Sequence, residues 1–150
     1  MTLPRHWRKS VPKKSLVIVF DTNILISYLF GGFTITTLID AVEKGAYIPV
    51  LSPYLEQEFL EVMHKPEISL RVNIVDALNF MREWKNFANY ITPRHKVTAY
   101  RDHNDNEVLA CALEVSADYI ISGDKDLLVL KEFHGIRIIS PADFVKNVLR

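Results

Sequence analysis

The chain has 150 residues, 49% of them hydrophobic, which is the size of one ordinary domain with a single core. Charged or turn residues interrupt every apolar run before the roughly 18 residues that cross a bilayer, so the sequence predicts no membrane span. Its 18 basic and 18 acidic residues balance, and its single cysteine, Cys111, excludes an internal disulfide. Cys111 stands in the apolar stretch NEVLACALEVS, and we expect a packed core thiol there.

The N-terminus differs in charge from the rest of the chain. Five of the 18 basic residues lie within residues 1–20, which contain no acid. We interpret residues 1–15 as a basic, flexible tail, although a basic arm that contacts phosphates is an alternative. The tail lacks the apolar core and cleavage site of a secretory signal, so we expect a cytoplasmic protein.

Predicted strands and helices alternate along the remaining chain. LVIVF at 16–20 is continuously apolar, rich in β-branched residues and too short for a helix, which is typical of a strand buried on both faces. Weaker strand patterns follow at 47–52, 89–92, 118–122 and 135–140. Segments of helical period lie at 23–30, 34–44, 54–64, 73–88, 105–116 and 141–149. This alternation predicts one α/β domain over residues 16–150, a parallel sheet with helices on both faces.

The region 70–87 carries more apolar residues than a minimal α/β core requires. They are Leu70, Val72, Ile74, Leu78, Phe80, Trp84 and Phe87. We interpret them as core or dimer contacts rather than as platforms for base stacking. On this surplus we expect a homodimer.

Acidic residues follow three of the predicted strands. Asp21 follows the first strand, Asp105 follows the third after a loop, and Asp124 follows the fourth. Each could be a helix cap, because each stands at or beside a predicted helix start. In a parallel sheet, however, the carboxyl ends of the strands meet at one edge. Carboxylates crowded there repel one another unless a cation neutralises them, and Mg²⁺ or Mn²⁺ is the natural partner.

Such a cluster supports metal-assisted hydrolysis of a phosphate ester, in which no protein nucleophile is needed. The motifs of other chemistries are absent from the sequence: there is no glycine-rich phosphate loop, no G-x-S-x-G and no C-x-x-C. The histidines share no metal-ligand spacing, and we interpret them as surface or packing residues; they are His6, His64, His95, His103 and His134.

Four blocks of the sequence resemble the PIN-domain nucleases in order and in approximate spacing. They are VFDTNILIS at 19–27, SPYLEQEFLEVM at 52–63, DHNDNEVLACAL at 102–113 and ADYIISGDKDLLVL at 117–130. The match is closest to the prokaryotic group assigned as toxins of toxin–antitoxin pairs. The resemblance implies a PIN-like three-layer α/β/α fold with a five-stranded parallel sheet, and a Mg²⁺- or Mn²⁺-dependent endoribonuclease. It also implies an RNA substrate and a cognate antitoxin protein.

The resemblance further implies a quartet of catalytic, metal-binding acids. By position these are Asp21, Glu58, Asp105 and Asp124. Glu58 follows from the family spacing alone, since helical periodicity does not separate it from Glu56. Supporting roles fall to Thr22, Asn23, Asp102, Ser122 and Asp126, where Asp102 is an alternative to Asp105 and Asp126 acts through water. Asn104 and Asn106, on either side of Asp105, are less usual but remove no ligand.

Three alternative hypotheses about the function compete with the PIN-domain nuclease. A response-regulator receiver would need a pair of neighbouring acids after the first strand, where this chain has one. A haloacid-dehalogenase-type phosphatase would need an aspartate at position 23, which is Asn23. The stronger alternative is a non-catalytic PIN module that binds RNA or acts as a scaffold, and the intact quartet argues against it.

Overall fold

The computed structural model describes residues 15–100 and 102–149. The predicted tail, apart from Ser15, lies outside the described residues, as does His6. A single sheet has the strand order β3-β2-β1-β4-β6-β5. Its strands are β1 (Leu16–Phe20), β2 (Tyr47–Leu51), β3 (Asn89–Tyr90), β4 (Tyr119–Ile121), β5 (Glu132–Phe133) and β6 (Ile136–Ile139).

The five predicted strands are all present, and all pair in parallel. The short strand β5 was not predicted; it pairs with β6 in the antiparallel sense at one edge. The α/β prediction is therefore confirmed, with a largely parallel sheet extended by a two-residue edge strand. Strand β1 occupies a central position, and its last three residues are fully or almost fully buried.

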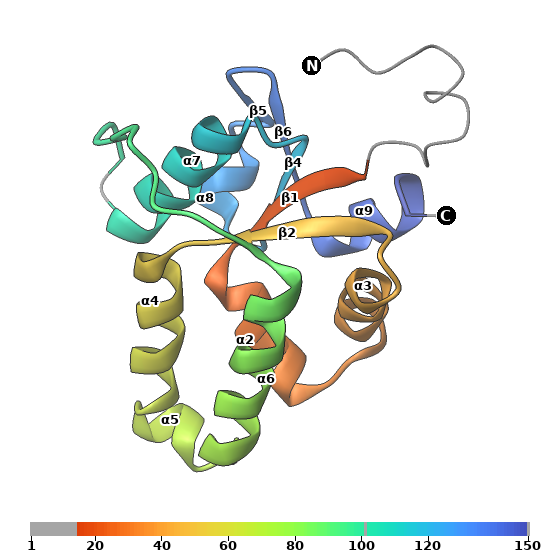
Figure 1. Cartoon of the computed structure of the whole chain (residues 1–150), viewed down its shortest axis with the longest axis vertical. Helices are drawn as coiled ribbons and strands as arrows, with labels where there is room; N and C mark the ends of the chain where they lie inside the picture. The colour runs from red at the N-terminus through yellow and green to blue at the C-terminus, as the bar shows by residue number, and fades with distance from the viewer. Residues whose placement is uncertain (1–14, 101, 150) are drawn as a thin grey trace.

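Helices cover the sheet on both faces (Figure 1). They are α2 (Thr22–Phe30), α3 (Phe33–Glu43), α4 (Pro53–Met63), α5 (Pro66–Ser69), α6 (Ile74–Phe87), α7 (His103–Val115), α8 (Lys125–Leu128) and α9 (Pro141–Asn147). Helix α7 packs on β1 and β4, whereas α3 and α6 contact β2 and α9 contacts α3. Helices α4, α5 and α6 form an arm that extends away from the sheet (Figure 1).

The apolar surplus of 70–87 divides between core and surface. Trp84 is buried and stacks with Phe80, and the Phe20 ring meets Trp84 edge-on at 5.3 Å. The core interpretation is confirmed for this pair. Leu70, directly after α5, is 87% exposed. Four apolar side chains of α6 are also exposed: Ile74, Val75, Leu78 and Phe87.

Cys111 is completely buried in α7, which confirms a core thiol. Burial raises the pKa of this thiol to about 12, so it is protonated at neutral pH and is a poor nucleophile. Within the described residues no single helix is long and apolar enough to cross a membrane; α2 and α3 meet that test only jointly, across a bend of 110°.

Candidate active site

Three of the predicted acids lie together at the carboxyl end of the sheet. One carboxylate oxygen from each of Asp21, Asp105 and Asp124 lies within 4.8 Å of the other two. Asp21 directly follows β1, Asp124 follows β4, and the first turn of α7 supplies Asp105. Because β1 and β4 pair in parallel, their ends bring the first two acids together, and α7 packs across both strands.

Helix capping distinguishes the roles of the two candidate acids at the start of α7. The cap is Asp102, whose carboxylate accepts from the Asn104 backbone N–H at 2.8 Å. Asp105 is therefore not used as a cap; it is 4% exposed, and its Oδ1 is buried without a hydrogen-bond partner among the described residues. An unpartnered buried acceptor is costly unless something donates to it or binds it. Asp105, rather than the exposed Asp102, is the acid that the fold directs into the cluster.

Asp21 is 1% exposed and is held by polar neighbours on both sides. The Ser122 hydroxyl donates to its Oδ2 at 2.8 Å, and the Asn104 side-chain amide donates to its Oδ1 at 3.1 Å. Burial raises the pKa of Asp21, these hydrogen bonds oppose the rise, and the charge of Asp124 adds to it. The carboxylate is thus fixed in orientation beside another acid.

Electrostatic crowding is strongest at Asp105. Burial, followed by the charges of Asp124, Asp102 and Asp21, raises its pKa to about 7. Among the described residues, no lysine or arginine forms an ion pair with the cluster. A divalent cation would relieve this repulsion, and oxygen-only ligands are those that Mg²⁺ and Mn²⁺ prefer. The residues present therefore fit a metal ion.

Glu58 lies near this group but outside the three-carboxylate cluster. Burial is the main cause of its raised pKa; Lys65 opposes the rise, and the charges of Glu61, Asp102 and Asp21 add to it. The neighbouring Glu56 is engaged elsewhere, because it accepts from the Tyr90 hydroxyl at 2.6 Å and pairs with Lys85 at 3.1 Å. Of the two glutamates, Glu58 is therefore the one that remains a candidate for the acidic site.

The predicted supporting residues differ in burial and in their contacts with the acids. Ser122 is buried and joins two acids, since its hydroxyl oxygen also accepts from the Asp124 backbone N–H. Thr22 is buried and donates to the Asn104 side-chain oxygen at a long 3.5 Å. Asp126 is exposed and lines a cavity together with Asp102 and Asp105. Asn23 is exposed and contributes its backbone N–H to the Asp21 carboxylate.

Sequence reasoning did not assign a role to Asn104. Its amide donates to Asp21 while its own N–H is capped by Asp102, so it connects the start of α7 to the end of β1. Asn106 closes the preceding loop through two hydrogen bonds with the Tyr100 backbone. The D-x-N-D-N spacing was the available indication, because an amide beside a buried carboxylate can orient it.

The sequence matches a known protein family. A family model described as the PIN domain matches residues 17–126, which include all four predicted acids. A search of curated proteins found no match to the chain.

Proposed function

The chain belongs to the PIN-domain family, and from this premise we propose that it is a Mg²⁺- or Mn²⁺-dependent endoribonuclease. The observation that carries the proposal is the cluster of Asp21, Asp105 and Asp124, whose carboxylate oxygens approach within 4.8 Å of one another. Glu58 is the fourth acid of the proposed site. When bound, a divalent ion lowers the pKa of a water, neutralises the phosphate and stabilises the leaving oxygen.

The chain's own residues prepare this site. In this proposal Asp21, Asp105 and Asp124 supply the ligand oxygens, and Glu58 on α4 is the fourth acid. Ser122 and Asn104 hold the Asp21 carboxylate from opposite sides, so little reorganisation is needed when a ligand binds. Asp105 keeps one buried oxygen free for a ligand. No observation favours a non-catalytic module, because no acid of the set is replaced.

The test is cleavage of single-stranded RNA by the purified protein in Mn²⁺ or Mg²⁺. We expect cleavage that EDTA abolishes and that Asp21→Asn reduces by about a thousandfold, because the substitution removes a ligand charge but keeps the shape. Asp143→Asn, an exposed position on α9, is the matched control and keeps full activity. Equal cleavage by the wild type and Asp21→Asn overturns the proposed function.

The biological role that we propose is that of a toxin restrained by an antitoxin. An unrestrained cytoplasmic ribonuclease would harm its host, so a small protein that covers the acidic cluster is expected. Induced expression of the chain alone then stops growth, while Asp21→Asn does not. Unimpaired growth with active wild-type enzyme contradicts the toxin role and leaves the nuclease proposal intact.

We also propose a homodimer through α6 and the end of α5, within the arm. Its support is the exposed apolar surface that includes Leu70, Val75 and Leu78. Light scattering across micromolar concentrations measures the mass directly. A monomeric mass throughout that range contradicts the dimer.

A further inference from the structure

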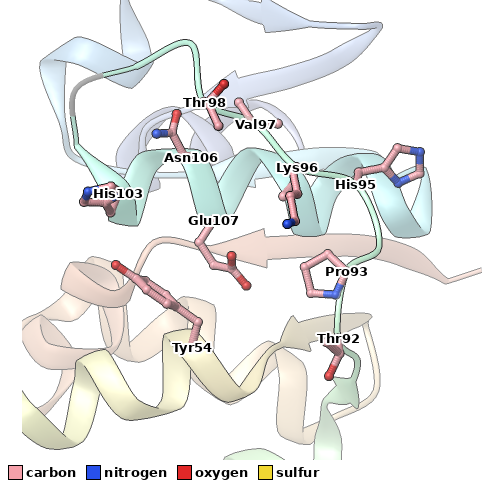
Figure 2. A pocket seen from close by; sticks show the side chains of 11 residues that line it. Tyr54, Thr92, Pro93, His95, Lys96, Val97, Thr98, His103, Asn106 and Glu107 are labelled. Carbon is pink, nitrogen blue, oxygen red and sulfur yellow. The ribbon is translucent and has the colours of Figure 1, made fainter.

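A second cavity lies beside the acidic cluster, between α7, the first turn of α4 and the segment 92–98 (Figure 2). Its volume is about 340 Å³, at the lower end of the roughly 300–1,000 Å³ that small-molecule sites occupy. None of the four proposed metal-binding acids lines it. The proposed hydrolysis therefore leaves this cavity without a role.

The cavity shares helix α7 with the acidic cluster, because its lining residues Asn106 and Glu107 directly follow Asp105. Tyr54 and His103 stand together at one of its ends (Figure 2), and His103 directly follows the capping residue Asp102. Burial raises the pKa of Tyr54, and the charges of Glu58, Asp102 and Glu107 add to the rise. Tyr54 lines the cavity and stands one helical turn before Glu58, the fourth proposed acid, on α4. A nucleotide next to the scissile phosphate would reach the cavity by passing this tyrosine.

The Glu107 carboxylate points into the cavity and is fixed there (Figure 2). The Ser52 hydroxyl donates to its Oε1 at 3.1 Å, and the Cys111 thiol lies 3.9 Å from the same oxygen. Among the described residues nothing donates to Oε2. A carboxylate can only accept hydrogen bonds, so Glu107 presents a positioned acceptor to whatever enters.

Lys96 supplies the complementary donor. Its side chain and the Glu107 carboxylate reach into the same space between α7 and Pro93 (Figure 2). Lys96 forms no ion pair with another described residue, whereas its neighbour His95 lies 3.4 Å from Glu114. The cavity therefore combines an aromatic ring, an acceptor and a donor on three separate segments. Single-stranded RNA is read by such sets, through stacking and through the hydrogen-bonding edges of unpaired bases.

We propose that this cavity binds one guanine base of the RNA, next to the phosphate that the acidic cluster attacks; the inference rests on the proposed function. The ring stacks on Tyr54, Glu107 accepts from guanine N1–H and the N2 amino group, and Lys96 donates to O6. Guanine is the base with two adjacent donors for a carboxylate. Adenine and cytosine offer one amino group beside an acceptor, and uracil offers one N–H between two carbonyls that repel the carboxylate.

The test is a titration of the ¹⁵N-labelled protein with each of the four nucleosides in EDTA, followed by NMR. Nucleosides carry no phosphate for the acidic cluster to repel, and neither metal nor cleavage is involved. Guanosine is expected to shift the amides of residues 92–98 and 103–110, and to bind about tenfold more tightly than the other three. Glu107→Gln removes about tenfold of the guanosine affinity, because one of the two acceptors becomes a donor.

Matched variants separate base recognition from loss of structure. Glu67→Gln, an exposed charge change on α5, leaves the guanosine affinity unchanged. Tyr54→Leu weakens all four nucleosides by a similar factor of about ten, since stacking does not distinguish bases. Equal affinity for all nucleosides, unchanged preference in Glu107→Gln, or no binding at all overturns the proposal.

The same variants distinguish this inference from the proposed function in a cleavage assay. With a functional nuclease, Glu107→Gln retains RNA cleavage but loses the preference for sites beside guanine. Guanosine binding without any metal-dependent cleavage overturns the proposed function alone. Cleavage whose positions are the same in the wild type and Glu107→Gln overturns the pocket alone.

Discussion

Aspartates have different roles at the two ends of the sheet. At the amino end, Asp118 stands just before β4, and its Oδ2 accepts from the Val17 backbone N–H at 2.8 Å. Its own N–H donates to the Val17 carbonyl at 2.8 Å, so this aspartate extends the pairing of β1 and β4. At the carboxyl end, Asp21 and Asp124 follow the same two strands and crowd against Asp105.

This difference shows that location, not residue type, makes a carboxylate functional here. The Asp118 carboxylate accepts a backbone N–H and lies outside the acidic cluster, so it stabilises the fold. The carboxyl-end group brings three acids together with no lysine or arginine paired to them among the described residues, and Asp105 has a pKa raised to about 7. That arrangement destabilises the metal-free protein, and it lies at the carboxyl ends of parallel strands, where ligands bind.

Among the tests of this comparison, the largest effect is expected at Glu58, the fourth proposed acid. Glu58→Gln is expected to lower RNA cleavage about 10- to 100-fold, because it neutralises the fourth acid of the proposed site. Glu56→Gln is the matched control two residues away. Its partners are Tyr90 and Lys85, so activity changes by less than about twofold. Equal activity of the two variants would remove Glu58 from the site.

A smaller effect is expected at the amino end. Asp118→Ala leaves the Val17 N–H without its acceptor and lowers the free energy of unfolding by about 1–2 kcal/mol, measured in urea. The specific activity of the folded variant is unchanged, because Asp118 lies at the opposite end of β4 from Asp124. A loss of activity in fully folded Asp118→Ala would contradict the view that the two ends of the sheet have separate roles.

The smallest effect has the opposite sign. The pKa of Asp105 is raised from 3.8 to about 7, so between these values the native state binds more protons than the unfolded state. The stability of the metal-free protein therefore falls as pH rises through this window and levels off above it. Asp105→Asn lacks this loss, and in EDTA above about pH 7 it is more stable than the wild type by about 1 kcal/mol, after allowance for solvent screening. If the free energy of unfolding in urea changed with pH in the same way for the two proteins, the raised pKa of Asp105 would be contradicted.

Sequence patterns predicted the features that depend on strand position. The five parallel strands followed from alternation, and the approach of Asp21 to Asp124 followed from the direction of β1 and β4. The family resemblance placed Asp105 in the quartet with Asp102 as the alternative, and the structure separates the two, because Asp102 caps α7 and Asp105 lies in the cluster. The structure also explained Glu56, whose contacts with Tyr90 and Lys85 come from segments remote in the sequence.

Other features were beyond sequence reasoning for physical reasons. Strand β5 and helix α8 are too short to show a period, with two and four residues. Asn104 acquires its role only when α7 packs across the end of β1, which no local pattern reveals. The cavity at Glu107 likewise depends on tertiary contact, because it brings Tyr54 of α4 together with segments 92–98 and 103–110, which lie much later in the chain.

The central claim is that the carboxyl-end acids, and not acidic side chains in general, bind a divalent metal. The most direct measurement is calorimetric titration of the wild type, Asp21→Asn and Asp118→Asn with Mn²⁺ at neutral pH. We predict that the wild type and Asp118→Asn bind Mn²⁺ with equal affinity and release protons as they do so, while Asp21→Asn binds at least about tenfold more weakly. Absence of Mn²⁺ binding by the wild type, or equal binding by all three proteins, would contradict the account.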